Sequence, residues 1–263
     1  MVFKKHFGYR FLGSVLLGIM ACSDEPNNEI PPETPVFPPF TATTFLDSDI
    51  LTESDPTVFT GLSYIGQALR TMFDRRVNDW VTLEPFLFNA GYQDGLSIEV
   101  QVNPEFLDVD TAEVLAQKYA RAIGQLPRAL RRDIETVWIH QGTELFGGGN
   151  NNILIHTGQA SLYEDEGILE EILVHEAAHT SLDADHAGTS GWLSAQEADG
   201  NFISTYAKDN PTREDMAETF LMYLAVRFLP ERIDTSLQDI VLNTIPNRMA
   251  YLDRQDFSMY PIE

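Results

Sequence analysis

The chain has 263 residues, of which 43% are hydrophobic and 11% aromatic, so it can form a sizeable core and is not a disordered or fibrous protein. It carries 40 acidic residues against 17 basic ones, a formal charge of −23, which makes nucleic acid and anionic lipid headgroups unexpected partners. The single cysteine excludes an internal disulfide, a cysteine-based zinc site and a CxxC redox pair. Any metal must therefore be held by histidine and carboxylate ligands.

Residues 1–21 have the pattern of an export signal. Basic residues precede the apolar run 11–21, which is too short for an ordinary membrane span. The run leads into Ile-Met-Ala-Cys22, which resembles the lipobox of bacterial lipoproteins, although Met20 stands where a smaller residue is commoner. This resemblance implies that Cys22 becomes the lipidated first residue of the mature chain; a plain cleaved signal or a free thiol is the alternative.

Residues 22–40 are predicted to form an extended polar tether, because they contain six of the fourteen prolines and no periodic apolar pattern. The acidic stretch 23–25 resembles the export tag of some surface lipoproteins, and an ordinary acidic linker explains it equally well. We expect a lipoprotein anchored through Cys22 at the outer membrane or cell surface of a Gram-negative bacterium. Residues 41–263 would then form a single domain of mixed helices and strands.

Apolar spacing predicts the first elements of that domain. Residues 57–73 have helical spacing, and residues 96–102 alternate like a strand. Helical patterns follow at 110–123 and 126–132.

Two further strands are predicted at residues 135–140 and 153–157. The sequence between them contains Gly-Gly-Gly-Asn-Asn-Asn at 147–152, which favours a turn and therefore an antiparallel hairpin. A phosphate loop is disfavoured, because the glycines are followed by a strand and not by Lys-Ser/Thr and a helix.

Residues 167–182 are predicted to form one helix containing the sequence His-Glu-Ala-Ala-His. His175 and His179 are four residues apart on the same helical face, so both imidazoles can converge on one tetrahedral ion. Glu176 lies near such an ion without having to bind it. In this arrangement the glutamate takes a proton from a metal-bound water, which then attacks a polarised carbonyl.

The HExxH motif resembles that of the zincins, zinc-dependent metallopeptidases whose active-site helix lies beneath the edge strand of a small sheet. The resemblance implies an α+β zincin-like fold with a small mixed sheet, a zinc ion, and a second helix that provides a metal ligand. It also implies that residues 153–157 form the edge strand and bind the substrate backbone as an added strand. A catalytic zinc needs a third protein ligand and one open position.

Spacing separates the candidates for this third ligand. The metzincin pattern would place it at Asp185, with His186 beside it, but Leu182 occupies the position of the glycine that allows the necessary turn. The gluzincin branch takes a glutamate from a second helix, which we predict at 210–228 from its cap, early proline and acidic first turn. Its sequence Glu-Asp-Met-Ala-Glu is similar to a motif of gluzincin-type families, including the anthrax lethal factor group, which implies Glu218 as the ligand.

Further roles are suggested by the metal chemistry. Asp215 is the preferred carboxylate to hydrogen-bond a metal-bound imidazole, with Glu214 and Asp183 as alternatives, although the acids at this helix N-terminus can also be purely structural. Tyr206 lies in a stretch that resembles the one carrying a tyrosine near the zinc, which implies oxyanion stabilisation; a buried structural tyrosine is the alternative. Residues 183–213 are predicted to be a long connection that forms a cleft wall or lid.

We therefore expect a monomeric zinc peptidase that hydrolyses protein or peptide substrates outside the cytoplasm. His175, His179 and Glu218 would hold the zinc, Glu176 would be general base and then general acid, and Tyr206 would stabilise the oxyanion. Two alternatives remain: a zincin-like binding or adhesion lipoprotein without turnover, and a zinc amidase acting on cell-wall or glycan substrates. HExxH alone does not distinguish a peptide from another amide, because the water attacks a carbonyl carbon in both.

Overall fold

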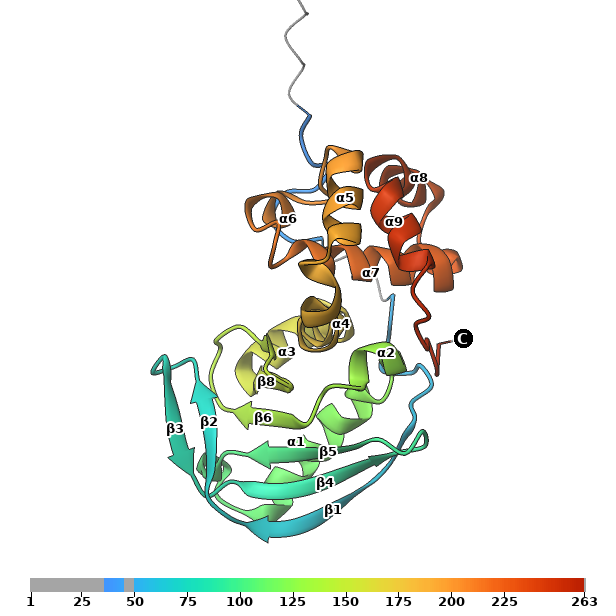
Figure 1. Ribbon diagram of the computed structural model, residues 1–263. Coiled ribbons are helices and arrows are strands. Elements are labelled where there is room, and N and C mark those ends of the chain that lie inside the picture. The colour runs from blue at the N-terminus through green and yellow to red at the C-terminus, as the bar shows by residue number, and fades with distance from the viewer. Residues whose placement is uncertain (1–35, 45–49, 263) are drawn as a thin grey trace, which may run out of the picture. The chain divides into compact units, whose positions relative to one another are not determined.

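The computed structural model describes residues 36–44 and 50–262. The predicted signal, Cys22 and residues 22–35 of the predicted tether lie outside these ranges. The residues in these two ranges form one compact α+β unit with a six-stranded sheet, a separate two-stranded sheet and several helices (Figure 1). Within the described ranges, no helix is both long and apolar enough to cross a membrane.

The main sheet is mixed, with the strand order β1-β4-β5-β6-β8-β7. β1, β4 and β5 are antiparallel neighbours, β5, β6 and β8 are parallel, and β7 is antiparallel to β8 at the edge. The strands predicted near 96–102, 135–140 and 153–157 are confirmed as β5, β6 and β8. The six strands are β1 (Phe59–Gln67), β4 (Phe86–Tyr92), β5 (Ser97–Val102), β6 (Thr136–His140), β7 (Gly147–Gly149) and β8 (Asn152–His156).

The predicted hairpin between residues 135–140 and 153–157 is wrong, because β6 and β8 run parallel. The chain passes beyond β8 after leaving β6 and returns through β7, so the glycine triplet is a strand and not a turn. Asn150 and Asn151, with φ of 50° and 58°, connect β7 to β8 as in a two-residue type I′ turn. β7 is therefore the edge strand on this side of the described sheet, and the prediction that 153–157 form the edge is also wrong.

The helix predicted over residues 57–73 is wrong as well. This segment forms β1 and then β2 (Arg70–Asp74), which pairs with β3 (Asp79–Leu83) in the separate two-stranded hairpin. Ile65 and Leu69, which belong to the apolar series that suggested a helix, are 54% and 65% exposed. Their spacing therefore did not mark a core-facing side.

Helices cover one face of the main sheet, and the principal core lies between them (Figure 1). Val137 and Ile139 of β6 and Ile153 and Ile155 of β8 are fully or almost fully buried in the same core as the helices, whereas alternate residues of these strands face the other side. The helical predictions at 110–123 and 126–132 are confirmed. The helices are α1 (Val109–Ile123), α2 (Arg128–Arg131), α3 (Thr157–Asp165) and α4 (Leu169–Ser181), with a short turn η1 (Pro104–Phe106).

α4, which contains the HExxH sequence, lies between the sheet and the C-terminal helices and contacts both β7 and α7 (Figure 1). The predicted helices at 167–182 and 210–228 are confirmed, but the second begins only at Asp215. The segment 183–213 is largely helical, in contrast to the predicted long loop. The remaining elements are η2 (Asp183–Ala187), α5 (Ser190–Asp199), α6 (Thr205–Asp209), α7 (Asp215–Phe228), η3 (Pro230–Arg232), α8 (Thr235–Thr244) and α9 (Pro246–Asp253).

Residues 36–44 lie alongside the segment that leads into α6. Phe40 pairs in parallel with Ser204, and the amide of Thr205 donates to the carbonyl of Phe40 over 2.9 Å. The amide of Tyr206 donates to the carbonyl of Ala42 over 3.3 Å. These contacts bring residues 42–44 to the N-terminal part of α7, where the candidate site lies.

Candidate metal centre

α4 and the start of α7 bring together Nε2 of His175, Nε2 of His179 and Oε2 of Glu214. The two nitrogens are 3.1 Å apart, and the carboxylate oxygen is 3.1 Å from His179 Nε2 and 3.3 Å from His175 Nε2. Ligand atoms about 2.0–2.1 Å from a tetrahedral zinc ion lie about 3.3 Å from one another. The three atoms therefore match three corners of a tetrahedral metal site, and this group could hold a metal ion.

The electrostatics of the group also favour a cation. Burial lowers the pKa of His179, but hydrogen bonds with Asp183 and Glu214 outweigh it and raise the pKa to about 10. Burial raises the pKa of Glu214, yet hydrogen bonds with His175 and His179 hold it well below its usual range. Positive charge is thus stabilised at the point where the three side chains meet, and a proton or a metal ion can supply it.

Each imidazole also faces a carboxylate with its other ring nitrogen. Nδ1 of His179 lies 2.8 Å from Oδ2 of Asp183, and Nδ1 of His175 lies 3.5 Å from Oε1 of Glu218. Outer carboxylates of this kind fix the orientation and tautomer of metal-binding imidazoles. Asp183, one of the sequence-based alternatives for this role, is therefore brought to the site.

Glu218 is almost completely buried, and hydrogen bonds hold both of its oxygens. Thr43 Oγ1 donates to Oε1 over 2.5 Å, while the Thr44 amide and Ser204 Oγ donate to Oε2 over 2.8 Å and 2.9 Å. The two threonines precede Glu218 by more than 170 residues, and none of the three donors was predicted from the sequence. They fix the position of the Glu218 side chain beside His175.

The structure groups Glu214, and not Glu218, with the two histidines. Sequence analysis predicted Glu218 as the third ligand, whereas Glu214 completes the group and Glu218 lies behind His175. Glu214 is the residue immediately before α7, at its N-cap position, where its side chain reaches both histidines. Both glutamates occur in the Glu-Asp-Met-Ala-Glu sequence, so the motif was informative even though the assignment within it differed.

The two alternative ligands lie outside the group. Asp185 forms an ion pair with Arg132 over 2.5 Å, and Nδ1 of His186 lies 2.9 Å from the hydroxyl of Tyr251. Both residues belong to η2, which follows α4 directly. The metzincin-like alternative therefore has no support from their positions.

Asp215, the preferred outer carboxylate, is engaged elsewhere. It is fully buried, accepts a hydrogen bond from Arg248 Nη1, and accepts another from Gln196 Nε2 over 2.9 Å. Its contacts anchor the first turn of α7 to α5 and α9. The structure thus gives Asp215 a role in positioning the helix that begins beside Glu214.

A cleft of about 620 Å³ opens at the three ligand atoms. Glu176 is half-buried and lines it beside His175, and Tyr206 lines it as well with 38% of its surface exposed. Burial, reinforced by the negative charge of Glu214, raises the pKa of Tyr206 to about 12. The phenol therefore keeps its proton near neutral pH and can donate a hydrogen bond into the cleft.

The edge strand β7 packs directly on α4 beside the cleft. A Cβ atom added at Gly148 would lie 1.8 Å from the carbonyl oxygen of Glu176, so only glycine allows this approach. Thr180 Oγ1 accepts a hydrogen bond from the amide of Gly149 over 2.8 Å and lies 2.9 Å from the carbonyl of Asn152. Sequence analysis recognised the glycines only as a turn and missed this contact.

Gly148→Ala is expected to destabilise the protein by about 1–3 kcal/mol, because the new methyl group collides with backbone that cannot rotate away. Thermal unfolding should report a fall of about 2–4 °C for each kcal/mol. Gly188→Ala is the matched control, since its added Cβ would meet no atom within 4 Å and its φ is −97°. Equal melting temperatures for the two variants would contradict the tight packing of β7 on α4.

No protein-family model, curated protein or solved structure matches this chain.

Proposed function

We propose that this protein is a zinc-dependent peptidase that hydrolyses peptide bonds of proteins or peptides. The observation that supports this most directly is the convergence of His175, His179 and Glu214 within 3.1–3.3 Å, with Glu176 lining the same cleft. Two imidazoles and one carboxylate with an open fourth position are a ligand set typical of catalytic zinc. A zinc ion bound there would act as a Lewis acid on a carbonyl and would lower the pKa of water.

The protein's own residues would handle the protons and the developing charge. Glu176 accepts a proton from the attacking water and later donates it to the amine that leaves. Tyr206, which keeps its phenolic proton, donates a hydrogen bond to the oxyanion of the tetrahedral intermediate. Asp183 holds the imidazole of His179 through a hydrogen bond, and the carboxylate of Glu218 orients His175 electrostatically from 3.5 Å.

The position of β7 supports a peptide as the substrate. It is the last strand on its side of the sheet and packs on α4 at Glu176. An extended peptide can add to such an edge through backbone hydrogen bonds, which binds many sequences with little dependence on one side chain. We further propose that the domain has a zincin-like fold and that Cys22 anchors it outside the cytoplasm as a lipoprotein.

Glu176→Gln should retain zinc but lose at least about 100-fold in hydrolysis, because the amide cannot accept the proton from water. We would digest a mixed-sequence peptide library with purified full-length protein and read the products by mass spectrometry, with and without a chelator. Glu197→Gln, at an exposed position on α5, is the matched control and should cleave normally.

Cleavage at the normal rate by Glu176→Gln would contradict the assigned general base. Cleavage by wild-type protein that a chelator does not stop would contradict the metal-dependent mechanism. If zinc-loaded wild-type protein cuts nothing, the binding lipoprotein and the zinc amidase become the better hypotheses.

A further inference from the structure

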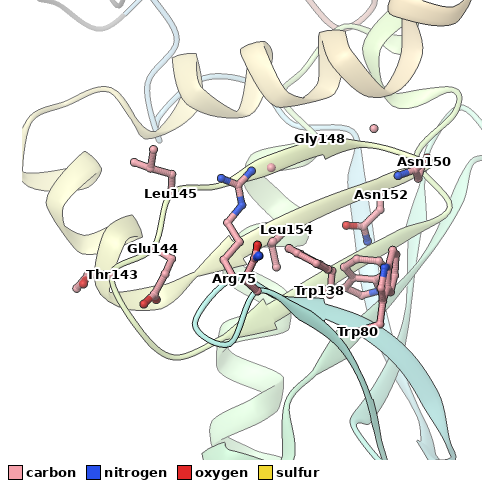
Figure 2. Close-up of a pocket in the computed structure, with 14 residues that line it drawn as sticks. Arg75, Trp80, Trp138, Thr143, Glu144, Leu145, Gly148, Asn150, Asn152 and Leu154 are labelled. Atoms are coloured by element: carbon pink, nitrogen blue, oxygen red, sulfur yellow. The ribbon is translucent and has the colours of Figure 1, made fainter. Parts of the chain in front are cut away.

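A second cleft, of about 610 Å³, lies between the β2–β3 hairpin and the main sheet (Figure 2). Trp138 and Leu154 line it from β6 and β8, where they alternate with the residues buried under the helices. Trp80 lines it from the hairpin, is 53% exposed, and meets Trp138 edge to face with ring centroids 5.5 Å apart. This cleft therefore presents aromatic surface on the side of the sheet opposite α4.

The two clefts meet at the edge strand. Arg75, Leu145, Gly148 and Gly149 line both of them. Arg75 stands at the tip of the hairpin, and Figure 2 shows its side chain extending toward β7. A Cβ atom added at Gly147 would lie 2.8 Å from Arg75 Nη2, so the absence of a side chain at Gly147 leaves room for the guanidinium group.

Arg75 and its neighbour Arg76 differ in their ion pairs. Arg76 forms ion pairs with Asp74 over 2.7 Å and with Glu105 over 2.6 Å, which secure the hairpin tip. The side chain of Arg75 forms no hydrogen bond or ion pair with any residue in the described ranges, and it is exposed. A chain with a formal charge of −23 repels anionic peptides in general, so an available guanidinium at the cleft provides a specific attraction for them.

A peptide that adds to β7 as an extended strand would direct alternate side chains to opposite faces of the sheet. Side chains on the hairpin side would meet Arg75 at the junction and the tryptophan-lined surface beyond it. A guanidinium group pairs well with a carboxylate because its N–H groups match the two oxygens. Both charge and position therefore select an acidic group at this point of the substrate.

We propose that Arg75 determines substrate specificity by binding a carboxylate of the peptide where it crosses β7, and that the tryptophan-lined cleft accommodates the adjoining residues. This inference rests on the proposed peptidase function. The carboxylate is either an aspartate or glutamate side chain or the C-terminus of the peptide, and matched substrates distinguish these two sources.

The test uses peptides that differ only in having glutamate, glutamine or lysine at successive positions around the cut site, each made as the C-terminal acid and the amide. Wild-type protein should show kcat/KM about tenfold higher for an acidic peptide than for its neutral counterpart. Arg75→Gln should abolish this preference, and Arg75→Glu should shift it toward lysine. Arg254→Gln, an exposed arginine outside both clefts, should behave as wild type.

Binding is measured separately from turnover, with the zinc-loaded Glu176→Gln variant and the same peptides. Trp80 and Trp138 line the cleft and Trp192 is fully buried, so intrinsic fluorescence should change on binding, and Trp80→Phe should reduce that change. If acidic peptides bind selectively but wild-type protein does not cleave them, the peptidase function is overturned and the carboxylate site at Arg75 is supported. If wild-type protein cleaves the peptides but Arg75→Gln leaves the substrate preference unchanged, the carboxylate site at Arg75 is overturned and the peptidase function is supported. If the protein neither cleaves nor binds these peptides, both the peptidase function and the Arg75 site are overturned.

Discussion

Glu214→Gln should reduce zinc affinity by more than about 100-fold, whereas Glu218→Gln should cost roughly 10–100-fold, the range typical of an outer carboxylate. The structure places Oε2 of Glu214 3.1 Å and 3.3 Å from the two histidine Nε2 atoms. Oε1 of Glu218 is 3.5 Å from Nδ1 of His175, the nitrogen on the other side of the ring. Loss of Glu214 would therefore remove one proposed ligand, and loss of Glu218 would weaken the orientation of another.

Zinc affinity would be measured by competition with a chromophoric chelator on the full-length variants. Glutamine keeps the size of each side chain, and far-UV circular dichroism would check that both variants fold. Glu197→Gln on α5 serves as the exposed control and should bind zinc as tightly as wild-type protein. A larger loss in Glu218→Gln than in Glu214→Gln would restore the ligand assignment that the sequence motif suggested.

The parts of the site that could be predicted from sequence are those that local geometry determines. His175 and His179 share a helical face because four residues span about one turn, and no tertiary contact is needed to know this. The periodic patterns of α1, α4 and α7 were likewise sufficient to predict these helices. Glu176 and Tyr206, predicted to act in the same site, do line one cleft.

The choice between Glu214 and Glu218 depended on contacts that no local pattern contains. α7 begins at Asp215, so Glu214 lies just outside the helix and turns toward the histidines. Thr43 and Thr44 donate hydrogen bonds to the carboxylate oxygens of Glu218 from about 170 residues earlier in the chain. Sequence spacing places both glutamates one turn apart and cannot show which of them other residues engage.

The topology of the sheet also depends on contacts that no local sequence pattern contains. Residues 147–149 have glycine in every position, so neither alternation nor β-propensity marks them as a strand. They form the edge strand because β8 pairs with them on one side and the backbone of α4 packs closely against Gly148. With that strand unrecognised, two nearby strands separated by a glycine-rich segment resembled a hairpin, although β6 and β8 run parallel.

Arg248→Met should destabilise the fold by about 3–5 kcal/mol, the usual cost of leaving buried partners of an ion pair without their counter-ion. Arg248 is fully buried between Asp199 and Asp215, whose side chains are also inaccessible to solvent. Its Nε donates to Asp199 Oδ2 over 2.9 Å, its Nη1 donates to Asp215, and its guanidinium carbon lies 4.9 Å from the ring centre of Phe202. The variant would retain two buried carboxylates with no cation between them.

The expected fall in melting temperature is about 6–20 °C, from 2–4 °C for each kcal/mol in a domain of this size. Arg227→Met is a matched control, because Arg227 and Asp253 also connect α7 to α9 through two hydrogen bonds of 2.9 Å and 2.8 Å. That pair is partly exposed, so its loss should cost only about 0.2–1 kcal/mol. Similar falls in melting temperature for the two variants would show that burial does not determine the cost of breaking an ion pair.

A further variant distinguishes the stability cost of unpaired buried charges from the cost of lost packing. If the two carboxylates cause the instability, Arg248→Met combined with Asp199→Asn and Asp215→Asn should recover much of the loss, because amides are less costly to bury than carboxylates. No recovery would assign the cost to the packing of Arg248 on Phe202 and its hydrogen bond to the carbonyl of Asn201. Asp215 follows Glu214 directly, so an α7 released from α9 should also misplace Glu214, the proposed third ligand. Arg248→Met should then bind zinc more weakly than Arg227→Met even at temperatures where both proteins are folded.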